Sequence, residues 1–189
     1  WDDAALAERV RAGQEVAFCA EDLAREYGAE RNIRIALPTI LFDERLTLDL
    51  GGITAELFHV PTDHSDDVVA VYIPEEAALF VSDATGPALY AAAPHYTAAK
   101  VAELVAFIGR FPALHIIESH SMPADPTAFW AENEILVVAA ELIGEGITQR
   151  AELLSALRGR LADRLPADTE EVIDLFLAGE TARSSAAGR

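Results

Sequence analysis

Two continuous apolar runs in the middle of the sequence constrain the fold more than any other feature. VVAVYIP (68–74) and AALFVSD (77–83) are separated by only two residues, Glu75 and Glu76. Strands that are apolar on both faces are typical of sheets covered on both sides. The two runs therefore predict neighbouring strands inside a layered structure.

The segments around these runs complete an alternating order of strands and helices. Leu46, Leu48 and Leu50 alternate with polar residues up to a Gly51-Gly52 turn, which is typical of a β-hairpin that returns through 53–57. Further extended segments are predicted at 33–42 and within 113–123. Helices are predicted from Asp2 or Asp3 to Tyr27, with an interruption at Gly13, and over 97–111.

Everything from Thr127 onward has a helical pattern until a polar tail. We therefore predict the α/β fold class, with a first domain over 1–126, a C-terminal helical region over 127–180 and a disordered tail over 181–189. The apolar stretch EILVVAAELI (134–143) either mediates a homodimer or packs on the parent sheet.

Charge and composition exclude several kinds of partner. The formal net charge is −18, so the surface repels nucleic acid and anionic lipid, and no apolar run approaches the roughly 18 residues of a membrane span. The single cysteine, Cys19, rules out a cysteine-based metal cluster and is expected to be a small buried thiol. The sequence shows no signal-peptide pattern, which predicts a cytoplasmic protein.

Two of the five histidines lie where functional side chains concentrate. His64 and His120 are on loops next to predicted strand ends, where a rigid backbone positions the side chain. His59 and His115 lie inside strand patterns and have simpler structural roles, and His95 lies just before a helix, where it could border a pocket.

Asp83 ends the second apolar run. Burial of its carboxylate there is unfavourable unless a cation or backbone amides offset its charge. From the residues alone, Asp83 is either a metal ligand or the cap of a turn. Asp66 and Asp67, near His64, either belong to a solvated turn or orient its ring.

The segment ELFHVPTDHSDDVVAVYIPEEAALFVSDATGP (56–87) resembles the middle of metallo-β-lactamase-fold hydrolases, in which a Gly-His-Ser/Thr turn precedes two strands and the second ends in Gly-Asp. LHIIESHSMP (114–123) is similar to the family's segment that carries a later histidine. The resemblance implies part of an αββα sandwich with a C-terminal helical extension.

The resemblance also implies a zinc-dependent hydrolase with two metal ions. His64 would bind the first ion, His120 the second, and Asp83 would be the catalytic residue that bridges both. A metal-bound hydroxide would then attack an ester, lactone, lactam or related bond of a small-molecule substrate. Loop 84–96 would shape the substrate pocket, with Tyr90, His95 and Tyr96 as candidate contacts.

The sequence departs from the family in its ligands and in its glycines. The His-x-His-x-Asp-His motif is missing, since no two histidines are closer than five residues. Ser82, Ser119 and Ser121 stand where the family has glycine, as does Asp63 before His64. Two explanations are open. The one that we favour is that the sequence is the C-terminal two-thirds of a larger hydrolase and would be inactive without the remaining third. The alternative is a non-catalytic relative that acts as a binding or assembly module.

Overall fold

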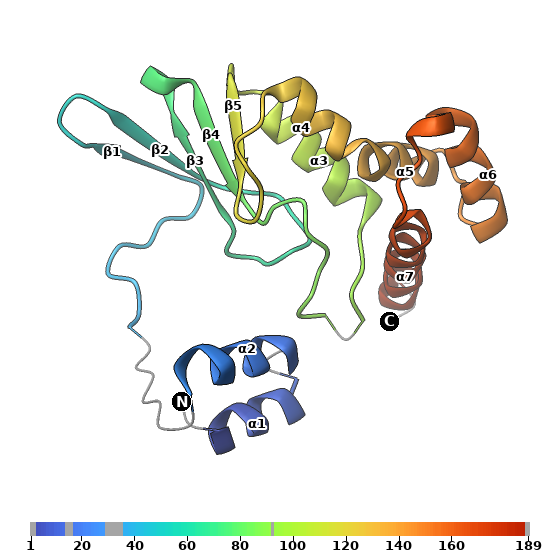
Figure 1. The fold of residues 1–189 in the computed structure, drawn as a ribbon, viewed down its shortest axis with the longest axis horizontal. Coiled ribbons are helices and arrows are strands. Elements are labelled where there is room, and N and C mark those ends of the chain that lie inside the picture. Colours follow the sequence, from blue (N-terminus) through green and yellow to red (C-terminus); the bar gives the residue numbers. More distant parts are fainter. Residues whose placement is uncertain (1–2, 14–16, 29–35, 92, 188–189) are drawn as a thin grey trace.

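The computed structural model describes residues 3–13, 17–28, 36–91 and 93–187. Its centre is a five-stranded sheet in the order β1-β2-β3-β4-β5 (Figure 1). The strands are, in order, Arg45–Asp49, Thr54–His59, Val69–Ile73, Ala78–Ser82 and His115–Glu118. The first four strands pair antiparallel, and β5 pairs parallel with β4. Together with the helices, this mixed sheet confirms the predicted α/β class.

The hairpin β1–β2 forms where the alternating leucines predicted it. Leu46 pairs with Leu57 and Leu48 with Ala55, so these apolar side chains share one face of the sheet. Gly51 and Gly52 both have positive φ, at 83° and 113°. Glycine adopts this backbone region without steric cost, which explains why the turn contains two of them.

One face of the sheet carries the main core. Ala70, Tyr72, Leu79 and Val81 are buried there against helix α3 (Ala98–Ile108) and Phe129 of α4 (Pro126–Glu132). Residues of the opposite face, such as Val71 and Phe80, are only half-buried. The expectation that the apolar strands are covered on both faces is therefore not met within the described residues, because α3 and α4 both add to the same core.

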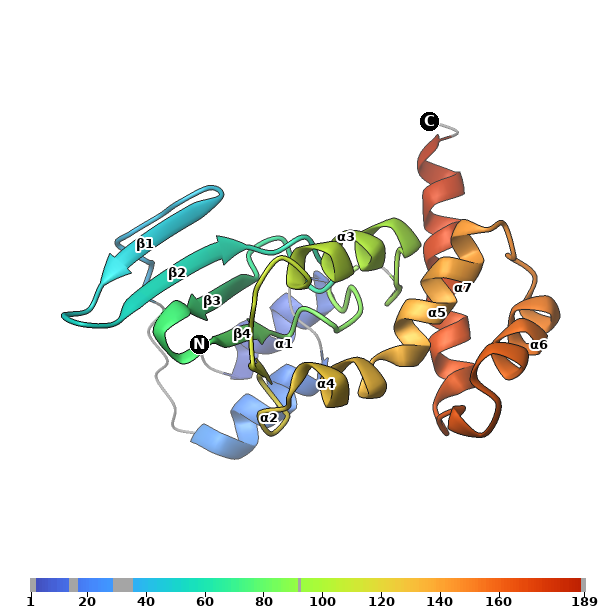
Figure 2. The same cartoon turned by 90° about the horizontal axis from the view of Figure 1, so that it is seen from above.

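The C-terminal helices build a second core beside the first (Figure 2). They are α5 (Glu134–Gly144), α6 (Arg150–Leu161) and α7 (Thr169–Ala187). Leu153, Leu157 and Leu161 recur every fourth residue on α6 and are fully buried. Val101 of α3 belongs to this second core, whereas Leu104 of α3 belongs to the first, so α3 joins the two.

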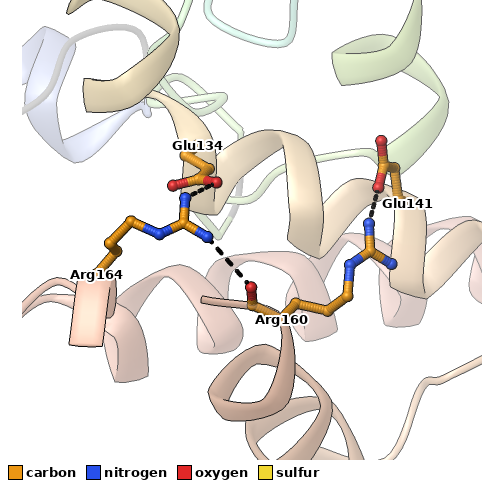
Figure 3. Close-up of polar contacts among 4 residues, drawn as sticks. All are labelled: Glu134, Glu141, Arg160 and Arg164. Carbon is orange, nitrogen blue, oxygen red and sulfur yellow. Dashed lines mark hydrogen bonds and ion pairs between the residues drawn. The ribbon is translucent and has the colours of Figure 1, made fainter. Parts of the chain in front are cut away.

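Arginines of the α6 region pair with glutamates of α5 at the surface (Figure 3). Arg160 Nη2 lies 2.5 Å from Glu141 Oε2, and Arg164 pairs with Glu134 while donating to the carbonyl oxygen of Arg160 at 3.3 Å. Exposed pairs of this kind contribute little stability individually, so the buried leucines hold α6 in place.

The ends of the chain differ from the sequence-based expectations in two places. The N-terminal segment forms α1 (Asp3–Arg11) and α2 (Ala17–Tyr27), separated near Gly13 as predicted. Residues 36–44 contain no strand, and 33–35 lie outside the described residues. The tail predicted to be disordered from 181 continues α7 to Ala187, and residues 188–189 lie outside the described part.

Side chains in the last part of α7 make contacts within the helix. Thr181 Oγ1 donates to the carbonyl oxygen of Leu177 at 2.9 Å, Ser184 Oγ donates to that of Glu180 at 2.9 Å, and Arg183 pairs with Glu180. The hydroxyl groups therefore bond within the helix. Across the described residues, none of the helices is both long and apolar enough to span a bilayer.

Candidate functional site

A pocket of about 820 Å³ opens where the β2–β3 turn meets the loop after β4. Its lining includes His64 and four aspartates: Asp63, Asp66, Asp67 and Asp83. None of the described residues that line it is a lysine or an arginine. A concave site with carboxylates and no opposing basic groups attracts cations.

His64 lies in this pocket with its ring against the backbone of the opposite loop. Its Nδ1 atom is buried and has no hydrogen-bond partner among the described residues. A Cβ atom at Gly86 would lie 2.6 Å from this nitrogen, so the ring needs a glycine there. A buried ring nitrogen without a partner is unfavourable unless a ligand, a metal ion or water satisfies it.

Thr62 fixes the backbone on the N-terminal side of His64. Its hydroxyl donates to the carbonyl oxygen of Ala84 at 2.6 Å and accepts from the His64 backbone N–H at 3.1 Å. Thr62 is only 4% exposed, so these bonds are shielded from water. The two loops that carry His64 and Asp83 are thus joined directly.

Asp83 follows β4 through a strained residue. Ser82 has φ of 56°, a left-handed conformation, at a position where the resembled family has glycine. The β4–β5 register also shifts between Phe80 and Ser82. This irregularity ends the strand and turns the chain towards the pocket, which the Asp83 side chain lines while remaining 32% exposed.

His120 comes to Asp83 from the loop after β5. Its Nε2 atom lies 3.2 Å from Asp83 Oδ1, although its side chain is 88% exposed. The backbone N–H of Ser119 donates to the carbonyl oxygen of Ser82 at 3.2 Å, which ties this loop to the end of β4. The structure therefore brings Asp83 into contact with His120, while His64 and Asp83 share the lining of one pocket.

The three candidate substrate contacts have different surroundings. Tyr90 lines the pocket and is 54% exposed. His95 is not among its lining residues, and its Nδ1 lies 3.0 Å from the carbonyl oxygen of Ala93. Tyr96 points towards the helices, where its ring centroid lies 5.3 Å from that of Phe176.

Tyr96 connects the pocket loop to the last helix. Its hydroxyl donates to the carbonyl oxygen of Thr85 at 3.0 Å, and its backbone N–H donates to that of Leu175 at 3.1 Å. Burial, with added repulsion from Asp168 and Asp63, raises the pKa of Tyr96 to about 12. Tyr96 therefore stays neutral and holds Thr85, whose own hydroxyl donates to Glu118 at 2.5 Å.

The remaining histidines lie outside the pocket lining. His59 Nε2 is 2.9 Å from the carbonyl oxygen of Asp66, which supports the turn that carries His64. His115 is exposed on β5. Sequence reasoning did not identify the roles of Thr62, Gly86 and Glu118, because each acts through a residue more than 20 positions away.

The side chains that could bind a metal ion do not match the zinc site that the resemblance implies. Among the described residues, no group of three or more His, Cys, Asp or Glu side chains is arranged to hold a metal ion. Catalytic zinc uses three protein ligands, whereas here a pair, Asp83 and His120, comes into direct contact. The described residues alone therefore do not complete a zinc site.

The fold and the site thus define an α/β protein with an acidic pocket at strand ends, and comparison with known proteins finds similarity to solved structures alone. No family model and no curated protein matches the sequence. Among solved structures, it is similar to a metallo-β-lactamase from Pontibacter korlensis, with 22% identity over 65% of this chain and a TM-score of 0.38. It is also similar to an inverting sec-alkylsulfatase from Pseudomonas sp., with 16% identity over 71% of this chain and a TM-score of 0.44. A third similar structure is a flavodiiron protein from Giardia intestinalis, with 19% identity over 71% of this chain and a TM-score of 0.41.

Each of these structures extends well beyond the region that this chain matches. This chain spans 57% of the Pontibacter protein, 23% of the sulfatase and 36% of the flavodiiron protein. TM-scores below 0.5 and identities below 25% do not assign a reaction, a metal or a substrate to this chain.

Proposed function

We propose that this chain is part of a metallo-β-lactamase-fold hydrolase that depends on zinc, with His64, Asp83 and His120 among the metal ligands. The observation that supports the proposal is the 3.2 Å contact between Asp83 and His120 beside the acidic pocket that contains His64. The buried, unpartnered Nδ1 of His64 adds a donor atom in the same pocket. Carboxylate and imidazole are ligands that zinc prefers.

Because the described donors do not complete a site, the proposal includes further ligands outside the described residues. In the complete protein we expect two zinc ions and hydrolysis of an ester, lactone, lactam or sulfate ester. Asp83 would be the catalytic carboxylate, and Tyr90, which lines the pocket, is the candidate substrate contact with the best position.

The test is metal analysis of the complete gene product, followed by assays with a panel of these substrates. We expect zinc to be retained after gel filtration, and Asp83→Asn and His120→Ala to lower both the zinc content and the hydrolytic rate. His115→Ala is the matched control, because His115 is exposed on β5 and does not line the pocket. A complete gene product that takes up no zinc would contradict the proposal.

One observation favours a second candidate, a non-catalytic member of the same superfamily that acts as a binding or assembly module. It is the lack of a three-donor group among the described residues. Such a protein would keep its fold and its partner when Asp83 or His120 is replaced. The metal analysis of the complete gene product distinguishes the two candidates.

A further inference from the structure

The N-terminus of α3 lacks the hydrogen bonds that usually come from its own sequence. The side chain of Thr97, which precedes the helix, makes no capping bond. In a capping box, the third helical residue is Glu or Gln and accepts from the N-cap backbone N–H. In α3 that residue is Lys100, which has no acceptor. The free N–H groups of this helix end therefore need an acceptor from elsewhere.

Asp63 supplies the acceptor from 34 residues earlier in the chain. Its Oδ2 atom lies 2.6 Å from the backbone nitrogen of Thr97, so the N–H of Thr97 donates to a carboxylate. A negative charge at a helix N-terminus is also stabilised by the helix dipole. This bond is therefore a short, charge-assisted link between the β2–β3 turn and α3.

The link fixes the residue next to His64 to a helix that packs on the core of the sheet. Leu104 and Phe107 of α3 are buried in the core with the sheet, so α3 is a rigid support. Thr62 holds the backbone N–H of His64 from the other side. Asp63 and Thr62 together leave the His64 peptide little freedom, and the ring remains against Gly86.

We infer that Asp63 is a positioning residue, whose carboxylate holds His64 in the pocket by binding the N-terminus of α3. That the position of His64 matters for ligand binding rests on the proposed function. The hydrogen bond between Asp63 and Thr97 does not depend on that function. The inference also explains why this chain has aspartate where the resembled family has glycine, since a glycine could not accept the hydrogen bond.

The experiment compares Asp63→Ala and Asp63→Asn with the matched control Asp66→Asn, all in the metal-free protein. Asp66 lines the same pocket, and within the described part of the chain its backbone oxygen contacts His59 whereas its carboxylate makes no hydrogen bond. The measurements are hydrogen exchange of the Thr97 amide and the imidazole resonances of His64 by NMR. The first reports the helix end, and the second reports the position of the ring.

We expect Asp63→Ala to speed exchange at Thr97 about tenfold, as for the loss of a helix cap, and to shift the His64 imidazole resonances. Asp63→Asn keeps an oxygen acceptor without the charge, so it should restore much of the protection and most of the His64 signal position. Asp66→Asn should leave the exchange at Thr97 unchanged and move the His64 signals much less. The milder Asp63→Asn variant keeps the comparison informative if Asp63→Ala does not fold.

Three results would overturn the inference. Unchanged exchange at Thr97 in Asp63→Ala would show that the bond does not form in solution. Faster exchange with unmoved His64 resonances would make Asp63 a cap without a positioning role. A shift of the His64 resonances in Asp66→Asn as large as that in Asp63→Ala would assign the effect to charge and not to positioning. Because these measurements need no metal, they remain valid if the complete protein binds no zinc.

Discussion

Replacing Ser82 by glycine should stabilise the protein, although most substitutions destabilise a fold. Ser82 has φ of 56°, and an L-residue in this left-handed region costs roughly 1–2 kcal/mol because its Cβ crowds the following carbonyl oxygen. Glycine avoids this cost but loses roughly 0.5–1 kcal/mol more backbone entropy on folding. The Ser82 hydroxyl makes no hydrogen bond within the described part of the chain, so its loss adds no penalty.

The difference between these two ranges is about 0–1.5 kcal/mol, and its midpoint of about 0.75 kcal/mol corresponds to a rise in Tm of about 1.5–3 °C for a chain of this size. Urea and thermal unfolding followed by circular dichroism would measure it. Ser119→Gly and Ser121→Gly are matched controls, because both serines also stand where the resembled family has glycine but neither has positive φ. Both control substitutions should lower the stability. If Ser82→Gly lowers Tm as the controls do, backbone strain at Ser82 is not the controlling factor.

Three further predictions concern the helices. Gly179→Ala should destabilise by about 1–3 kcal/mol, because its Cβ would lie 2.0 Å from the carbonyl oxygen of Tyr96. The control Gly159→Ala, with open space around it on α6, should stabilise by about 1 kcal/mol in the same unfolding assay. The pKa of Tyr96 is raised to about 12 from 10.0, so the stabilisation by the neutral phenol is complete below pH 10 and should be lost as the pH rises towards 12. The free energy of unfolding measured against pH should show this loss. In Tyr96→Phe the loss over this pH range should be absent. Asp125→Ala should lower the free energy of unfolding by about 1 kcal/mol. The reason is that Asp125 Oδ1 accepts hydrogen bonds from the backbone N–H groups of Thr127 and Ala128 at the start of α4. An unchanged midpoint of urea unfolding would contradict this capping role.

Local patterns were sufficient to predict most secondary structure elements. The alternating leucines and the Gly51-Gly52 turn predicted the β1–β2 hairpin, and the two apolar runs predicted β3 and β4. These features depend on side-chain periodicity and on backbone preferences within a few residues, both of which a sequence displays directly. The polar residues of the tail after 180 suggested disorder, whereas its alanines and Arg183 are good helix formers, and the structure continues α7 to Ala187.

The candidate site was less predictable, because its contacts join distant segments. The sequence indicated His64, Asp83 and His120, and the structure places His120 in contact with Asp83, which lines the same pocket as His64. It could not indicate that Asp63 binds Thr97 or that Gly86 makes room for the His64 ring, since loop packing decides both. Whether the three candidate ligands bind metal remains a prediction.

The position of Tyr96 has a practical consequence for anyone who shortens or redesigns this chain. Removal of α7 would take away the carbonyl oxygen of Leu175 and the ring of Phe176, both of which hold Tyr96. The Thr85 carbonyl oxygen would then lose a fixed donor at the edge of the loop that carries Asp83. We therefore expect trimming of the last helix to loosen the loop that carries Asp83, even though the two are far apart in the sequence.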